Sequence, residues 1–89
     1  MLSIRRLSQF RRDYKRVEKQ GKAMQAIDKI IVVLATKQLT EKRFKDHKLS
    51  GIYKDCRECH INPDWLLIYQ ITKSELVLIR TGSHAELFK

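Results

Sequence analysis

The sequence predicts an α+β domain in which a short N-terminal strand and two helices come first and a three-stranded meander follows. Helix-like periodicity occupies residues 7–36, and strand-like segments occupy residues 53–81. Helices grouped before strands are typical of a helical layer packed on a mainly antiparallel sheet. With 89 residues, the chain is long enough for one such domain, spanning residues 1–89, with one modest core.

The N-terminal part carries the helical signals. Residues 2–4 alternate briefly, which predicts a short first strand. Apolar residues then recur at spacings of three and four, which predicts amphipathic helices over residues 7–20 and 22–36. Gly21 ends the first helix and leaves almost no linker. We therefore expect an antiparallel helical hairpin that covers one face of the sheet.

The C-terminal part carries the strand signals. Residues 37–51 are polar and predict a loop, after which strands are expected at residues 53–61, 65–72 and 75–81. Pro63 separates the first two strands, and residues 72–74 predict a tight hairpin. The middle strand is almost continuously apolar, as in a strand covered on both faces. Ser83 and Glu86 have the spacing of a capping box, which predicts a last short helical turn.

The chain is strongly basic, with a formal net charge of +9. Such a charge favours a polyanionic partner: a nucleic acid, an acidic protein or an anionic membrane surface. It can also serve solubility alone. The first helix concentrates it on one face, which carries Arg11, Arg12, Lys15 and Arg16. No segment approaches the roughly 20 apolar residues of a membrane span or has a signal-peptide core, so we expect a cytoplasmic protein without a membrane partner.

The two cysteines form one Cys-x-x-Cys pair, Cys56 and Cys59. On a strand, residues three positions apart point to opposite faces, which is unsuitable for a shared metal or a redox disulfide. A zinc site of this type also needs a second pair of ligands. We therefore expect two ordinary reduced thiols, no metal and no cofactor.

Several residues suited to acid–base chemistry lie outside the helical stripes: His47, His60, Asp64 and His84, with Arg57 and Arg80 nearby in the sequence. If they converge, they could cleave RNA through its 2′-hydroxyl without a metal. Histidine can act as base and as acid near neutral pH, and arginine can stabilise charge on the phosphate. Trp65 or Phe88 could stack on an unpaired base, which is worth about 1–3 kcal/mol. Without convergence, the histidines are ordinary surface residues and Trp65 belongs to the core.

Three blocks of the sequence resemble the RelE/ParE superfamily of bacterial toxins, specifically its YafQ-like branch. The blocks are KDHKLSG at residues 45–51, RECHINPDWLLIY at residues 57–69 and RTGSHAELF at residues 80–88. They occur in the order of the family, and the resemblance extends over nearly the whole chain. It implies the RelE-like microbial ribonuclease fold.

The resemblance also implies a function: the toxin of a type II toxin–antitoxin system, acting as a ribosome-dependent mRNA endonuclease that cuts codons in the A site. Its implied partners are a cognate antitoxin, mRNA on the ribosome and ribosomal RNA. The family's active-site positions fall on His47, His60, Asp64, Trp65, His84 and Phe88. Of these, His84 is the expected proton-transfer residue, His60 and Asp64 share acid–base and positioning work, and His47 and Phe88 hold substrate.

The remaining implied contacts are electrostatic. Arg57 and Arg80 are expected to face phosphate, and the basic helix face to bind the antitoxin or the ribosome. Lys48 and Ile52 depart from the family pattern. The resemblance therefore says less about codon preference and substrate binding than about the chemistry. Two alternatives stay open: a non-catalytic ParE-like toxin acting on a protein such as a topoisomerase, and a structural ribosome-binding protein.

Overall fold

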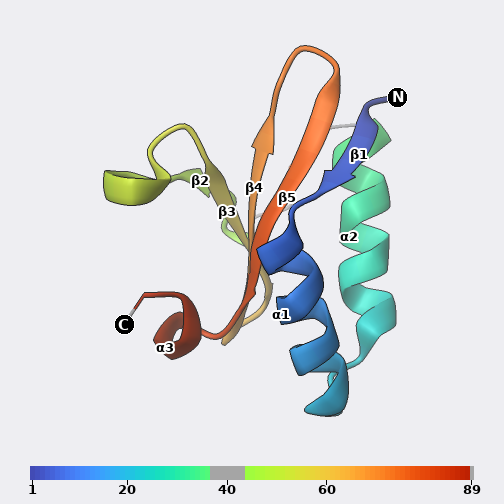
Figure 1. Ribbon diagram of the computed structural model, residues 1–89, viewed down its shortest axis with the longest axis vertical. Helices are drawn as coiled ribbons and strands as arrows, with labels where there is room; N and C mark the ends of the chain where they lie inside the picture. The colour runs from blue at the N-terminus through green and yellow to red at the C-terminus, as the bar shows by residue number, and fades with distance from the viewer. Residues whose placement is uncertain (37–43, 89) are drawn as a thin grey trace.

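The computed structural model describes residues 1–36 and 44–88, and it confirms the α+β class. Two helices precede the meander, and a short helix follows it (Figure 1). In chain order the elements are β1 (Ser3–Arg6), α1 (Ser8–Lys19), α2 (Met24–Thr36), β2 (His47–Lys48), the 3₁₀ helix η2 (Gly51–Tyr53), β3 (Arg57–Asn62), β4 (Trp65–Ile71), β5 (Glu75–Gly82) and α3 (His84–Leu87).

The five strands form one mixed sheet in the order β1-β5-β4-β3-β2. The strands β3, β4 and β5 make the antiparallel meander expected from the sequence, and β2 adds an antiparallel edge. The strand β1 pairs in parallel with β5, but only along Glu75–Leu78. Within the described residues, the second half of β5 therefore has no neighbouring strand on that side.

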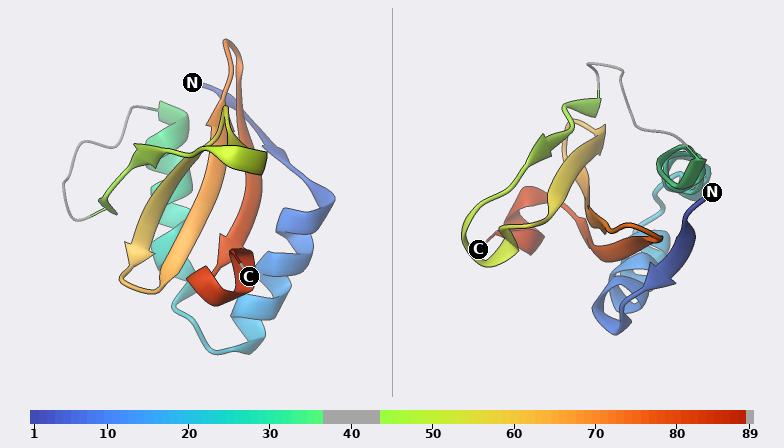
Figure 2. Two further views of the ribbon diagram at one scale, coloured as in Figure 1. Left: turned by 90° about the vertical axis from the view of Figure 1, so that its left-hand side faces the viewer. Right: turned by 90° about the horizontal axis from the view of Figure 1, so that it is seen from above.

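The helices α1 and α2 cover one face of the sheet, as the hairpin interpretation predicted (Figures 1 and 2). Phe10, Val17 and Ile27 from the helices pack against Leu67 and Leu78 from the sheet. Each fully buried side chain of this size stabilises the fold by about 1.5–3 kcal/mol. No helix in the described part of the chain is long and apolar enough to cross a membrane.

The middle strand β4 is buried on both faces over Trp65–Tyr69, as its continuous apolar sequence predicted. On the face away from the helices, Leu66 and Ile68 pack against Leu87 of α3 and Tyr53 of η2. Figure 2 shows that the β2–η2 segment and α3 both stand on this second face. Between them they frame the part of the sheet made by β3 and β4.

The strand predicted for residues 53–61 was wrong at its beginning. Residues 51–53 form η2, and β3 starts only at Arg57. Asp55 has a φ of +67°, a left-handed conformation that breaks an extended run. The backbone N–H of Leu49 then bonds to the carbonyl of Cys56, which brings the chain back beside β3. The loop predicted at residues 37–51 contains the short strand β2, and its residues 37–43 lie outside the described part of the chain.

Candidate active site

The strand β3 presents two ionisable side chains to the face framed by η2 and α3. Side chains alternate along a strand, so Glu58 and His60 share this face while Arg57 and Cys59 face the helices. Cys59 lies in the helix-side core, and Cys56 packs in the apolar cluster of the opposite face. The expectation that the two thiols do not meet is confirmed, and both are free.

His47 reaches the same face because β2 pairs with β3, directly opposite Glu58. Its Nε2 lies 2.8 Å from Oε2 of Glu58, and its Nδ1 lies 2.7 Å from the carbonyl oxygen of Lys45. A carbonyl oxygen can only accept, so Nδ1 must carry a proton. The His47–Glu58 contact then needs one further proton between the two groups. The geometry therefore fits an imidazolium–carboxylate pair.

His84 comes to this face from the other side, as the first residue of α3. The predicted capping box is present: the Ser83 hydroxyl accepts from the Glu86 N–H, and the Glu86 carboxylate accepts from the Ser83 N–H. The His84 ring centroid lies 5.6 Å from that of His60. Its Nδ1 lies 3.7 Å from Oδ1 of Asp64, which gives a protonated His84 a nearby counter-charge.

The aromatic side chains of this face form a continuous series of rings. Ring centroids are 6.4 Å apart for His47 and His60, 6.2 Å apart for His84 and Phe88, and 5.9 Å apart for Phe88 and Tyr53. Phe88 is 42% exposed, so its ring is accessible to a ligand. The structure thus brings together His47, His60, Asp64, His84 and Phe88, as the sequence predicted.

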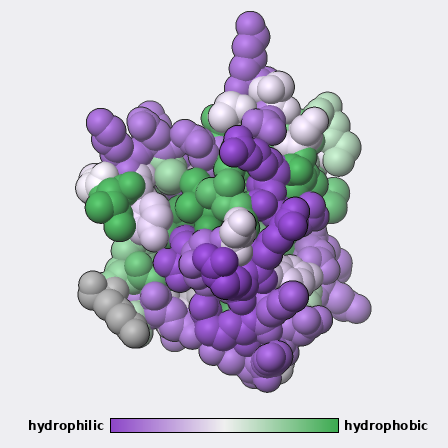
Figure 3. Space-filling view, viewed as in Figure 1, coloured by the Kyte–Doolittle hydropathy of each residue, from purple (hydrophilic) through white to green (hydrophobic). Residues whose placement is uncertain are grey.

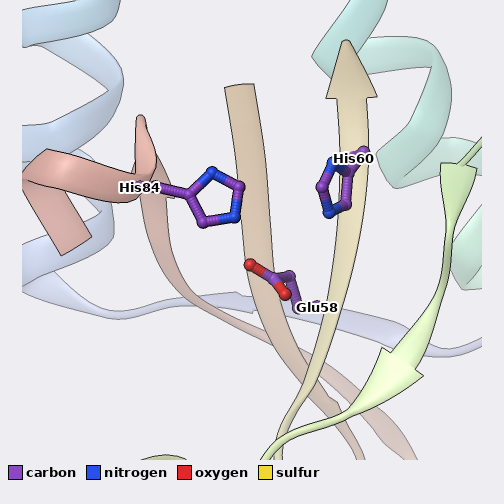
Figure 4. A group of neighbouring side chains, drawn as sticks. All are labelled: Glu58, His60 and His84. Atoms are coloured by element: carbon purple, nitrogen blue, oxygen red, sulfur yellow. The ribbon is translucent and has the colours of Figure 1, made fainter. Parts of the chain in front are cut away.

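Glu58 is the centre of this arrangement, and the sequence interpretation did not include it. Figure 4 shows its carboxylate below and between the rings of His60 and His84. Glu58 is only 4% exposed, and its Oε1 has no hydrogen-bond partner among the described residues. A buried, unpaired carboxylate oxygen is costly. Its orientation toward two imidazoles suggests that it stabilises a proton there.

The imidazole of His60 is held in its neutral form. Burial is the largest cause that lowers the pKa of His60 below its ordinary value of 6.5. The charge of Glu58 opposes this shift, whereas His84, Lys45 and His47 add to it. A neutral imidazole at neutral pH can accept a proton, which is what a general base requires.

Glu58, His60 and His84 could also hold a metal ion. One ligand atom from each lies within 4.8 Å of the others. Two imidazoles and one carboxylate are a suitable donor set for zinc, copper or nickel. The unpaired Oε1 of Glu58 is as consistent with binding a metal ion as with stabilising a proton on a neighbouring imidazole. The expectation of no metal therefore needs a direct test.

Two of the predicted substrate contacts are corrected by the structure. Trp65 is 1% exposed and lies in the helix-side core, where its Nε1 donates to Thr81 Oγ1 at 2.9 Å. Its ring cannot stack on a base. Arg57 lies on the face away from His60, and its guanidinium bonds Asp46 at 2.6 Å. The Tyr69 hydroxyl donates to the same carboxylate. The Arg57 guanidinium therefore anchors Asp46, the residue before His47, rather than contacting phosphate.

The basic residues of α1 and β5 divide into exposed and engaged groups. Arg11, Arg12 and Lys15 are exposed, as predicted, and hydrophilic side chains dominate the surface over α1 in Figure 3. Arg16 is instead paired with Asp13 and Glu86, which corrects its assignment to the free face. Arg80 also bonds Asp13, through Nε and Nη2. Its interaction with Asp13 raises the pKa of Arg80 and keeps it charged.

Two of the missed residues had signals in the sequence. Glu58 lies two positions before His60 on a strand and must share its face. Asp13 lies three residues after Phe10 and four before Val17, on the buried stripe of α1. An acidic residue on such a stripe indicates a buried partner. Tyr53 had no comparable signal, because its place depends on η2.

Solved structures share this fold over their full length. A chain from the crystal structure of the Escherichia coli DinJ–YafQ complex matches with a TM-score of 0.92 and 34% identity, covering 100% of this chain and 100% of that one. A metal-bound toxin from Helicobacter pylori matches with a TM-score of 0.91 and 46% identity, covering 99% of this chain and 100% of that one. These matches place the chain among small bacterial toxins.

The sequence comparisons define the family. A curated relative, the mRNA interferase toxin YafQ of Escherichia coli K12, is 38% identical over 81 residues, covering 90% of this chain and 88% of that protein. The family model described as bacterial toxin of type II toxin-antitoxin system, YafQ, matches residues 2–89. The chain belongs to the YafQ family of bacterial toxins, as the resemblance of the three sequence blocks implied.

Proposed function

We propose that this chain is the toxin of a type II toxin–antitoxin pair, an endoribonuclease that cuts mRNA on the ribosome in the cytoplasm. The observation that carries the proposal is the convergence of His47, His60 and His84 beside Glu58 and Asp64. A purely protein-binding toxin has no need of three imidazoles around two carboxylates. The mRNA interferase name of the curated relative supports the same reaction class.

The geometry supports a division of roles in cleavage through the 2′-hydroxyl. Neutral His60 takes the 2′-hydroxyl proton, and the 2′-oxygen attacks the adjacent phosphorus. Glu58 stabilises the imidazolium that His60 becomes. His84, with Asp64 beside it, protonates the departing 5′-oxygen. The products are a 2′,3′-cyclic phosphate and a free 5′-hydroxyl.

The charge that develops on the phosphate also needs stabilisation. His47, when protonated, is one cation on this face. Arg80 is the second: its bonds to Asp13 use Nε and Nη2, and its further hydrogen bond is to Tyr53, which lies on this same face. Such fixed cations act without reorganising during the reaction. Phe88, with its exposed ring, is the proposed stacking surface for a base.

The proposal is tested by expressing the chain in cells and mapping the 5′ ends of mRNA. We expect new 5′ ends at a fixed place within in-frame codons, because the ribosome presents one codon at a time. Intact mRNA in growth-arrested cells would instead support the ParE-like alternative. Cuts that ignore the reading frame would contradict ribosome dependence while keeping the nuclease.

Cleavage should weaken on the acidic side of neutrality. The lowered pKa of His60 keeps the base neutral at pH 7, and protonation below that pKa removes its ability to accept a proton. We expect the cleavage rate to fall about tenfold per pH unit below the pKa of His60. Single-turnover cleavage of ribosome-bound mRNA over a pH series measures this. A rate that keeps rising as pH falls below the pKa of His60 would contradict the role of His60 as base.

Metal ions should inhibit the reaction rather than support it. A copper or zinc ion held by Glu58, His60 and His84 would occupy the lone pairs that the proton transfers need. The metal-bound Helicobacter pylori relative supports testing this site. We expect micromolar copper to suppress cleavage and a chelator to restore it without lowering the metal-free rate. A large loss of activity in chelator alone would indicate a metal-dependent nuclease.

The exposed basic face of α1 is the proposed contact for an acidic segment of the antitoxin. It borders a groove of about 510 Å³ whose walls include Phe10, Tyr14 and Ile31. An amphipathic acidic helix could place apolar residues in the groove and carboxylates against Arg11 and Lys15. The DinJ–YafQ complex supports an antitoxin partner.

Neutralising Arg11, Arg12 and Lys15 together to glutamine should weaken antitoxin binding, most strongly at low salt, because surface charges are screened as salt rises. Titration calorimetry at several salt concentrations measures the loss. The matched control is Lys73→Gln on the exposed β4–β5 hairpin, which should bind normally. Unchanged, salt-insensitive binding by the triple variant would limit this face to a role in solubility.

A further inference from the structure

The short helix α3 lacks the length to hold its own position. It has four residues, whereas isolated helices shorter than about 12 residues are marginal in water. Its first residue is His84, so the placement of this imidazole depends on what anchors α3. Leu87 anchors one side in the apolar cluster below η2. The other anchor is Glu86.

Glu86 connects α3 to α1 through both carboxylate oxygens. Its Oε1 accepts the Ser83 N–H of the capping box at 2.8 Å and lies 3.5 Å from Arg16 Nη2. Its Oε2 lies 3.1 Å from Arg16 Nε and 3.0 Å from Gln20 Nε2. One carboxylate therefore caps the helix that carries His84 and ties that helix to α1.

Arg16 is itself fixed on the edge of β5. Its Nη2 donates to the carbonyl of Thr81 at 2.9 Å, and its Nη1 bonds Asp13 at 2.8 Å. Asp13 in turn accepts the Thr81 N–H at 3.2 Å. The pairing of β1 with β5 ends at Leu78. Beyond that point, the side chains of Asp13 and Arg16 make hydrogen bonds to the β5 backbone in place of a neighbouring strand. The guanidinium thus joins the edge of the sheet to α3.

Gly82 shows how closely Arg16 passes over the end of β5. Its φ is +156°, and a Cβ built there would lie 2.6 Å from Arg16 Nη2 and 2.9 Å from Glu86 Oε1. Any side chain at this position would push the arginine away from the carboxylate. The chain therefore leaves room here for the Arg16–Glu86 contact.

We propose that Arg16 and Glu86 are positioning residues for cleavage, which hold α3 so that His84 stays within reach of the His60 side of the site. This inference rests on the proposed function, because it assigns His84 a part in the reaction. Arg16 acts through Glu86 and contacts no substrate. It follows that α1, whose outer face is proposed to meet the antitoxin, also determines where His84 lies.

The test compares Arg16→Gln, Glu86→Gln and the double variant with wild type and with Glu18→Gln, a matched charge change at an exposed α1 position. The first readout is the imidazole NMR spectrum without substrate. We expect His84 signals to shift and broaden in all three variants while His47 signals stay in place. The control should match wild type.

The second readout is cleavage. We expect each single variant to lower kcat about tenfold with KM within about twofold, because a small misplacement of a catalytic group is costly. The double variant should lose no more than the singles, since both break the same contact. Arg16→Lys should restore part of kcat.

Unmoved His84 signals, or additive losses in the double variant, would overturn the positioning role. So would a loss of kcat that matches only the fraction of unfolded protein, measured by circular dichroism. Absence of cleavage by wild-type protein would count against the proposed function alone. The NMR comparison would still decide whether Arg16 and Glu86 set the position of His84.

Discussion

Replacing His84 by alanine should lower the rate of mRNA cleavage by about a thousandfold. General acid–base catalysis by one positioned group typically contributes 10²–10⁴-fold, and His84 is the proposed donor to the leaving oxygen. Its ring lies 5.6 Å from that of His60 and projects from the start of α3. Single-turnover cleavage of ribosome-bound mRNA measures the change, and growth arrest on expression should disappear with it.

The fold should survive this change, because the His84 side chain is half exposed and packs in no core cluster. Circular dichroism and antitoxin binding should match wild type. Lys73→Ala on the distant β4–β5 hairpin is the control that should retain full activity. Retained toxicity in cells expressing His84→Ala would reject His84 as the acid.

Replacing Asp13 by alanine should lower the free energy of unfolding by about 3–5 kcal/mol, the usual cost of removing one partner of a buried ion pair. The Asp13 side chain is 0% exposed and accepts from Arg16, Arg80 and Thr81. Its loss leaves two guanidinium groups without their carboxylate. Since small domains have only about 5–15 kcal/mol of stability, urea unfolding should show a large shift of the midpoint.

The same side chain predicts how stability depends on pH. Burial alone would raise the pKa of Asp13, but hydrogen bonds from Arg80, Gln9, Arg16 and Thr81 lower it below its ordinary value of 3.8. A lowered pKa gives stability above pH 3.8 that is lost as pH falls through the pKa of the folded state.

We therefore expect the stability difference between wild type and Asp13→Asn to shrink below pH 3.8. The control is Asp28→Asn, which removes a carboxylate that accepts from the Tyr14 hydroxyl at the surface. Its free energy of unfolding should stay close to that of wild type at every pH. A difference that stays constant down to pH 2 would contradict the linkage.

The helices and the meander could be predicted because their signals are local. The spacing of Phe10, Tyr14 and Val17 defines a helical face, and the apolar run from Trp65 to Tyr69 defines a buried strand. The beginning of β3 could not be predicted, because it depends on the left-handed backbone conformation of Asp55. The strand β2 has two residues and exists through its pairing with β3, a long-range contact that no local pattern encodes.

The candidate site was predictable as a set of positions but not as a set of contacts. The three histidines and Asp64 were singled out because they are suited to acid–base chemistry and lie outside the helical stripes, the family resemblance implied the same positions, and they lie together. The prediction that Arg57 faces phosphate was wrong because Arg57 and His60 lie three positions apart on β3, and such residues point to opposite faces of a strand. Arg16 was placed on the free face because its partners, Asp13 and Glu86, come from the same helix and from a segment 70 residues away.

The central claim is that the clustered histidines cleave RNA through the 2′-hydroxyl of the cut nucleotide. The most direct measurement uses ribosome-bound mRNA carrying a single 2′-deoxynucleotide at the mapped cleavage position. We predict that this mRNA stays intact while the all-ribose mRNA is cut to a 2′,3′-cyclic phosphate and a 5′-hydroxyl. Cleavage of the deoxy-substituted mRNA at the same bond would contradict the mechanism.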